Sequence, residues 1–150
     1  MKLSIFDGII TGIENEGNIK LGYSFFYSEV YRVKKAIEMI KENEKTVILF
    51  DEIFKGTNLK DAFSALERLI KGLAILKKGI FIISSHLIEL EEVLKYTNGI
   101  IFKCFKVSEE NFEIKYSYKI ETGVSEDRSG IYIMEKEGIF DLLEKTILNK

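Results

Sequence analysis

Two adjacent carboxylates, Asp51 and Glu52, follow an uninterrupted run of apolar and β-branched residues at positions 46–50. A run of this kind predicts a strand that is buried on both faces, as in a parallel sheet. Acidic side chains fixed at the end of such a strand can hold a magnesium ion beside phosphate groups, and the second of them can orient an attacking water. The simpler alternative is an acidic strand end that is only solvated.

His86 is the single histidine of the chain, and it follows a second short apolar run at positions 80–83. In parallel sheets, ligands gather at the carboxyl ends of the strands, and the Asp51-Glu52 and Ser85-His86 pairs both fall at such ends. A neutral imidazole there can reach a γ-phosphate or its attacking water. A helix cap or an ordinary surface histidine is the alternative for His86.

Gly22, Tyr23 and Ser24 precede a long helical pattern. A serine and free backbone amides at a helix N-terminus form an anion site, although an ordinary N-cap explains Ser24 equally well. Glu29 lies one turn further along the same helix, where a solvated charge is the default expectation.

Three helices and three short strands are expected to alternate over the first two thirds of the chain. The first helix is expected over about 24–41, with its apolar face at Phe26, Val30, Val33, Ile37 and Ile40. After a turn at 56–58, the second helix carries apolar residues at Ala62, Phe63, Leu66, Leu69, Ile70, Leu73 and Leu76, and Gly79 ends it. A shorter third helix is expected over 87–96, and a strand or strand end over 1–13.

The last third of the chain changes character. Apolar residues at 100–107 predict a strand, and strict alternation from Phe112 to Glu121 predicts a half-exposed one, with a hairpin loop at 108–111. Two short helices broken at Gly138 are expected over about 130–148. The fold class is therefore α/β, a mainly parallel sheet flanked by helices, with an antiparallel hairpin and C-terminal helices.

Composition excludes several classes of protein. The chain has 150 residues, 46% hydrophobic and 31% charged, which suits one domain with a core rather than a disordered tail. Its net charge of -2 argues against a strongly basic nucleic-acid domain, and Cys104, the only cysteine, excludes a disulfide scaffold. No membrane span and no signal peptide are evident, so we expect a cytoplasmic protein.

Taken together, these motifs resemble the second half of the ATPase domain of the MutS family of DNA mismatch-repair proteins, over nearly the whole chain. The segment 21–29 (LGYSFFYSE) resembles the family's signature loop, and 47–53 (VILFDEI) resembles its Walker B strand. Further matches are the turn at 56–58 (GTN), the His switch at 84–86 (SSH), and the glycine spacing between 123 and 138. The resemblance implies a P-loop NTPase-like (ABC-type) partial domain, with an α/β core at 1–99, a hairpin at 100–122 and a helical tail at 123–150.

The resemblance also implies a role for each motif. Asp51 would position Mg²⁺, Glu52 would be the catalytic carboxylate, and His86 would sense the γ-phosphate of ATP. Two such domains face each other in this family, either as a homodimer or with a MutS-like partner. The nucleotide-binding residues at the contact between them, partly in trans, would be Gly22, Ser24, Thr57 and Asn58. DNA would be held by other domains.

One departure from the family pattern limits these expectations. No Gly-Lys-Ser or Gly-Lys-Thr occurs in the sequence, so the phosphate-wrapping P-loop of the family is missing from it. We therefore expect weak or no ATP binding by these residues alone, and the chain could be a fragment, one half of a split gene or a degenerate relative. The alternatives are a non-catalytic dimerisation or interaction module derived from the same domain, and part of another ABC-type ATPase.

Overall fold

A computed structural model describes residues 5–13, 25–42, 45–76, 78–110, 113–125 and 129–148. The chain divides into two compact units, residues 1–100 and residues 101–150. Each unit is described by itself below. Within the described ranges, no helix is long and apolar enough to cross a membrane.

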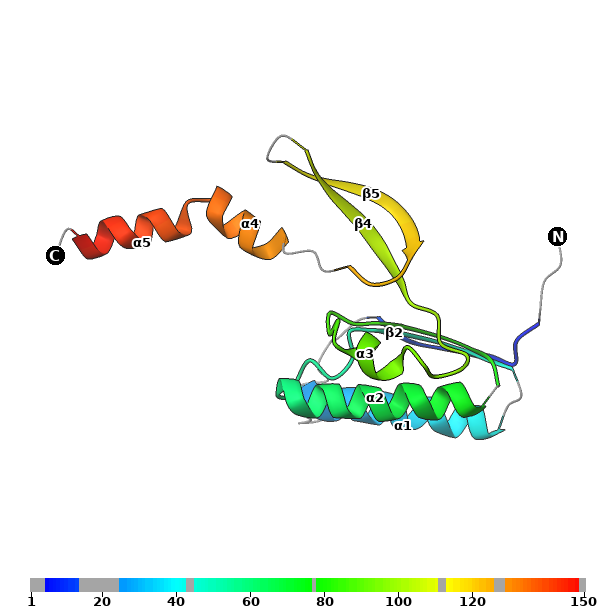
Figure 1. Ribbon diagram of the computed structural model, residues 1–150. Helices are drawn as coiled ribbons and strands as arrows, with labels where there is room; N and C mark the ends of the chain where they lie inside the picture. Colours follow the sequence, from blue (N-terminus) through cyan, green and yellow to red (C-terminus); the bar gives the residue numbers. More distant parts are fainter. Residues whose placement is uncertain are drawn as a thin grey trace. The chain divides into compact units, whose positions relative to one another are not determined.

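Unit 1 is a three-stranded parallel sheet in which two helices connect successive strands and a third helix follows the last strand (Figure 1). The strands are β1 (Gly8–Gly12), β2 (Thr46–Asp51) and β3 (Ile80–Ser84), and their spatial order is β1-β2-β3. The helices are α1 (Phe25–Glu42), α2 (Leu59–Leu76) and α3 (Leu90–Leu94). The parallel pairing of β2 with both neighbours confirms the expected α/β class and places the carboxyl ends of the strands at one edge.

The helices cover one face of this sheet (Figure 1). On that face Ile48 and Phe50 of β2 are almost fully buried, and a side chain added at Gly8 of β1 would meet Met39 of α1. On the opposite face the register aligns Ile9, Val47 and Ile80, and the two outer isoleucines of this row are exposed. The helix-covered face therefore forms the core that fixes β2 between its neighbours.

The buried stripe of α1 differs from the expected one. Val30 and Ile37 were expected in the core, but both are exposed. The buried positions, at steps of four, three and four, are Glu29, Val33, Ala36 and Ile40. The apolar pattern alone gave the wrong face for these two residues because it counted only large side chains. A small residue, Ala36, and a carboxylate, Glu29, are both buried on this face.

The third helix is shorter than the expected span of 87–96, since α3 covers only Leu90–Leu94. Before it, the Leu90 amide donates to the Leu87 carbonyl and the Glu91 amide donates to the Ile88 carbonyl. These bonds between residues three apart form tight turns. The side chains of residues 87–89 are therefore placed by turns and not by an α-helix.

Unit 2 contains a β-hairpin and two helices, namely β4 (Lys103–Glu110), β5 (Glu113–Thr122), α4 (Ser129–Lys136) and α5 (Ile139–Leu148). The strands are antiparallel, as expected. The expected hairpin loop at 108–111 is too long, because residues 108–110 still pair with β5 and Glu110 lies opposite Glu113. The break between the two helices falls at Gly138, which has a left-handed φ of 68°.

Gly79 lies directly before β3, and its substitution tests how β2 and β3 pack together. Its φ is 99°, and a Cβ added there would collide with the carbonyl oxygen of Thr46 in β2. We expect Gly79→Ala to lower the free energy of unfolding by about 2 kcal/mol or more, measured by urea denaturation.

The matched control is Gly72→Ala in α2, where an added Cβ meets nothing within 4 Å. This substitution should stabilise the protein by roughly 0.5–1 kcal/mol, because alanine is the better helix former. Equal effects of the two substitutions would contradict the role assigned to Gly79.

Candidate active site

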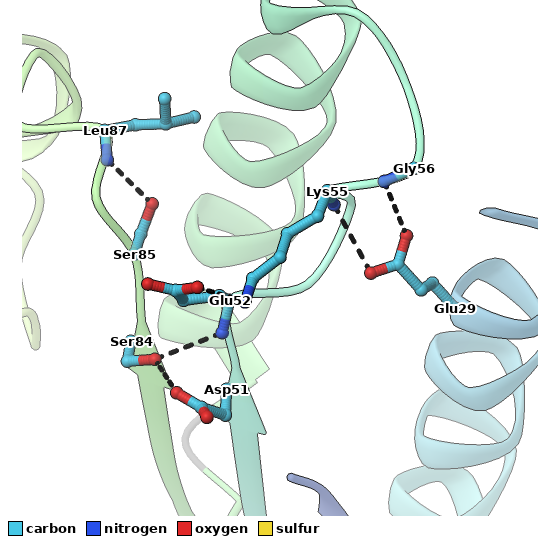
Figure 2. A network of polar contacts seen from close by, with 8 residues as sticks. All are labelled: Glu29, Asp51, Glu52, Lys55, Gly56, Ser84, Ser85 and Leu87. Carbon is cyan, nitrogen blue, oxygen red and sulfur yellow. Dashed lines mark hydrogen bonds and ion pairs between the residues drawn. The ribbon is translucent and has the colours of Figure 1, made fainter. Parts of the chain in front are cut away.

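The ends of β2 and β3 are joined through Ser84. The strand register places Asp51 opposite Ser84, and the Ser84 hydroxyl donates a hydrogen bond to Asp51 Oδ1 (Figure 2). The backbone amide of Glu52 donates to the Ser84 carbonyl at 3.2 Å and to Ser84 Oγ at 3.1 Å. Ser84 therefore binds the Asp51 carboxylate and the Glu52 backbone amide at the sheet edge, and the Asp51 side chain remains exposed to solvent.

The backbone turns sharply directly after β2. Glu52 and Phe54 have left-handed φ values of 45° and 69°, which are uncommon for residues other than glycine. The side chains of Ile53 and Phe54 are buried, and their packing stabilises this turn. Left-handed residues that persist in this way are often found at functional sites.

Lys55 forms an ion pair with Glu52 across this turn. The hydrogen bond to Glu52 raises the pKa of Lys55, and the charges of Glu52, Asp51 and Glu29 act in the same direction, although partial desolvation opposes them. The ammonium group therefore stays protonated and lies among three carboxylates. Because the pair is partly exposed, we assign it an orienting role rather than a large share of the stability.

Glu29 holds the same turn from the side of α1. Its carboxylate is almost fully buried, and it accepts hydrogen bonds from the amides of Lys55, at 3.3 Å, and Gly56, at 3.2 Å (Figure 2). The expectation of a solvated charge at Glu29 is therefore wrong. A sequence signal did exist, because Glu29 is in helical register with Val33, Ala36 and Ile40.

Asn58 has a structural role at the start of α2. Its Oδ1 accepts from the Asp61 amide at 3.0 Å, its carbonyl accepts from the Ala62 amide at 3.0 Å, and its Nδ2 donates to Asp61 at 2.6 Å. Asn58 is thus an N-cap of α2. Thr57, its neighbour, is half-buried. The suggested contact of both residues with a nucleotide or partner stays a prediction.

His86 is exposed two residues beyond Ser84, so it lies near the same sheet edge. Its backbone is held by a local turn, in which the Leu87 amide donates to Ser85 Oγ at 3.1 Å and the Ile88 amide donates to the His86 carbonyl at 3.1 Å. The imidazole is therefore open to a ligand from solvent. Gly22 and Ser24, the remaining predicted site residues, lie outside the described residues.

The donor set at this edge suits magnesium shared with a phosphate ligand. Within the described ranges, no group of three or more His, Cys, Asp or Glu side chains could enclose a metal ion. Magnesium usually retains waters and takes only one or two carboxylates together with substrate phosphates. The exposed Asp51 carboxylate, with Glu52 next to it, fits that mode of binding.

Ser84 supplies a test of this geometry. We expect Ser84→Ala to lower the free energy of unfolding by about 1 kcal/mol, because the Asp51 carboxylate and the Glu52 amide both lose a partner. Ser64→Ala, at an exposed position of α2, is the control and should be neutral or slightly stabilising. A neutral Ser84→Ala in urea unfolding would contradict the role of Ser84 as the link between the strand ends.

Comparison with known proteins identifies the family. The model of MutS domain V matches residues 1–146. The DNA mismatch repair protein MutS of Wolbachia pipientis is 26% identical over 148 residues, which cover 99% of this chain and 17% of that protein. The MutS proteins of Thermotoga petrophila and Streptococcus agalactiae are 27% and 25% identical, over 98% and 95% of this chain and 19% and 17% of their own lengths. The chain thus spans less than a fifth of these relatives, and its match to domain V over 146 of 150 residues shows that it belongs to the MutS family.

Proposed function

We propose that this chain forms the magnesium- and water-positioning part of a MutS-type ATPase domain of the P-loop class, acting in DNA mismatch repair or related DNA binding. The observation that carries the proposal is the pair Asp51 and Glu52 at the carboxyl edge of a parallel sheet, tied to Ser84. The relatives that match the chain are named DNA mismatch repair proteins, and the match includes this edge.

Asp51 would hold the magnesium ion that accompanies ATP, because its carboxylate is exposed and oriented by the Ser84 hydroxyl. The ion, when bound, would neutralise phosphate charge. Glu52 would accept a hydrogen bond from the attacking water and orient it, since its backbone is fixed by two bonds to Ser84. His86 would reach the γ-phosphate from the end of β3.

The other contacts to the nucleotide would come from residues that do not lie at this strand edge. A phosphate-wrapping P-loop would have to be supplied by another segment or chain, because the sequence has no Gly-Lys-Ser or Gly-Lys-Thr. In a facing pair of such domains, a homodimer or a pair with a MutS-like subunit, Ser24 would contact the nucleotide of the partner and Asn58 would lie at the contact between the domains. Gly22 and Thr57 would complete the nucleotide-binding residues. DNA would be bound by other domains, in keeping with a net charge of -2 here.

The test supplies the missing P-loop segment, either in frame or as a separate chain. We expect the 150-residue chain alone to bind Mg-ATP no more tightly than roughly millimolar, and the completed domain to hydrolyse ATP. Glu52→Gln should lower kcat at least about 100-fold and leave ATP bound, because it removes the orienting carboxylate and keeps its shape. Asp51→Asn should instead weaken magnesium-dependent ATP binding, measured by calorimetry.

Glu92→Gln, on the exposed side of α3, is the matched control and should change neither property. If Glu52→Gln behaves like Glu92→Gln, the catalytic assignment is wrong. If the completed wild-type domain binds its partner chains but never hydrolyses ATP, the non-catalytic interaction module becomes the better account.

A further inference from the structure

The turn after β2 is attached to the first turn of α1 by three separate contacts, which we call the α1–turn joint. The first is the pair of hydrogen bonds from the Lys55 and Gly56 amides to the Glu29 carboxylate. The second is the packing of the Phe26 and Phe54 rings, whose centroids lie 6.2 Å apart. These contacts join residues that lie 26 to 28 positions apart in the sequence.

The third contact is a close approach of backbones at Gly56. A Cβ added to Gly56 would lie 2.9 Å from both Cα and Cβ of Phe26 and 2.8 Å from a ring atom of Phe25. Such distances leave no room for a side chain, because the nearest atoms include backbone that cannot move independently. A displacement of the first turn of α1 toward this turn would therefore push on the segment that contains Gly56.

A buried carboxylate at this contact has a cost in desolvation free energy. Burying a charged group is unfavourable unless it is hydrogen-bonded, and Glu29 is 1% exposed. Its two acceptor oxygens each take one amide of the turn, so a single side chain fixes two consecutive peptide groups. An apolar residue could fill the same space, but it could not hold those amides in place.

We propose that Glu29 is a positioning residue, which fixes the Glu52 carboxylate by clamping the turn after β2 and couples it to the first turn of α1. The role in ATP hydrolysis rests on the function proposed above, whereas the clamp itself does not. Glu52 lies three residues before Lys55 and is tied to it by the ion pair, so releasing the Lys55 and Gly56 amides loosens one of the two anchors of Glu52 and leaves only its bonds to Ser84 intact. Movement at the start of α1 would thereby change the position of the water-orienting group.

The first experiment measures residue-resolved amide hydrogen exchange by NMR on the 150-residue chain. Glu29→Gln keeps the shape of the side chain but replaces one acceptor with a donor that faces an amide. We expect the Lys55 or Gly56 amide, and with it the Glu52 amide, to exchange at least about tenfold faster. Amides in the middle of β2 and β3 should keep their protection. Glu42→Gln, at the exposed end of the same helix, is the control and should change nothing.

The second experiment measures ATP hydrolysis by the domain completed with a P-loop segment. Glu29→Gln should lower kcat about 10- to 100-fold and leave KM within about twofold, because the residue touches the turn and not the nucleotide. If Glu29→Gln does not fold, Gly56→Ala disrupts the same joint from the other side and should show the same pattern of exchange and kcat.

Each outcome decides a separate point. Unchanged exchange at Lys55 and Gly56 in the folded Glu29→Gln protein would overturn the clamp. Faster exchange there with an unchanged kcat would overturn the coupling to Glu52. If the completed wild-type domain is inactive, the proposed function fails, and the exchange of the Glu52 amide alone then decides whether Glu29 positions that residue.

Discussion

The turn after β2 leaves the sheet with a left-handed backbone at Glu52 and again at Phe54. The position of Glu52 at the candidate site depends on how this turn is held. One attachment is Ser84, which binds both the Asp51 carboxylate and the Glu52 amide. The other is the buried Glu29 carboxylate, which accepts two amides of the same turn. The first fixes the turn to the sheet and the second fixes it to α1, so Glu52 is positioned by two different elements of unit 1.

Much of this arrangement could be predicted from the sequence. The apolar run before Asp51 correctly predicted a parallel strand, but not its burial on both faces, because Val47 and Leu49 of β2 are only half-buried. The polar residues after 50 and 83 were expected at one edge, and the ends of the parallel strands do meet there. Other features could not be predicted, and most of them depend on contacts between residues distant in sequence. Val30 and Ile37 are exposed because Ala36 and Glu29 occupy the contact surface of α1, which a count of large apolar residues misses. The expected third helix is too long, because turn bonds between residues three apart take the place of helical bonds before Leu90. The link through Ser84 depends on strand register, which no single run of residues specifies.

Membership of the MutS family and the geometry of the strand edge support each other. The first concerns the kind of domain, and the second concerns how its residues are arranged. The family match covers 146 residues, but those residues amount to less than a fifth of the full-length relatives. We propose that different parts of these residues serve different nucleotide sites. The end of β2 would serve the nucleotide of its own domain, the start of α1 would serve that of a facing domain, and the α1–turn joint would connect the two. The ATP state of one site would then affect the other site through the contacts of this joint, among them the buried Glu29 carboxylate.

The most direct test of this account is the ATPase activity of isolated mixed dimers in a form completed with its P-loop segment. One subunit carries Ser24→Ala, and the other carries Glu52→Gln. If the two ends of the joint serve different sites, both defects fall on one composite site, and about half of the wild-type activity remains. If Ser24 serves the site of its own subunit, each site carries one defect. Activity close to zero would then contradict the account and leave Ser24 as a local helix cap.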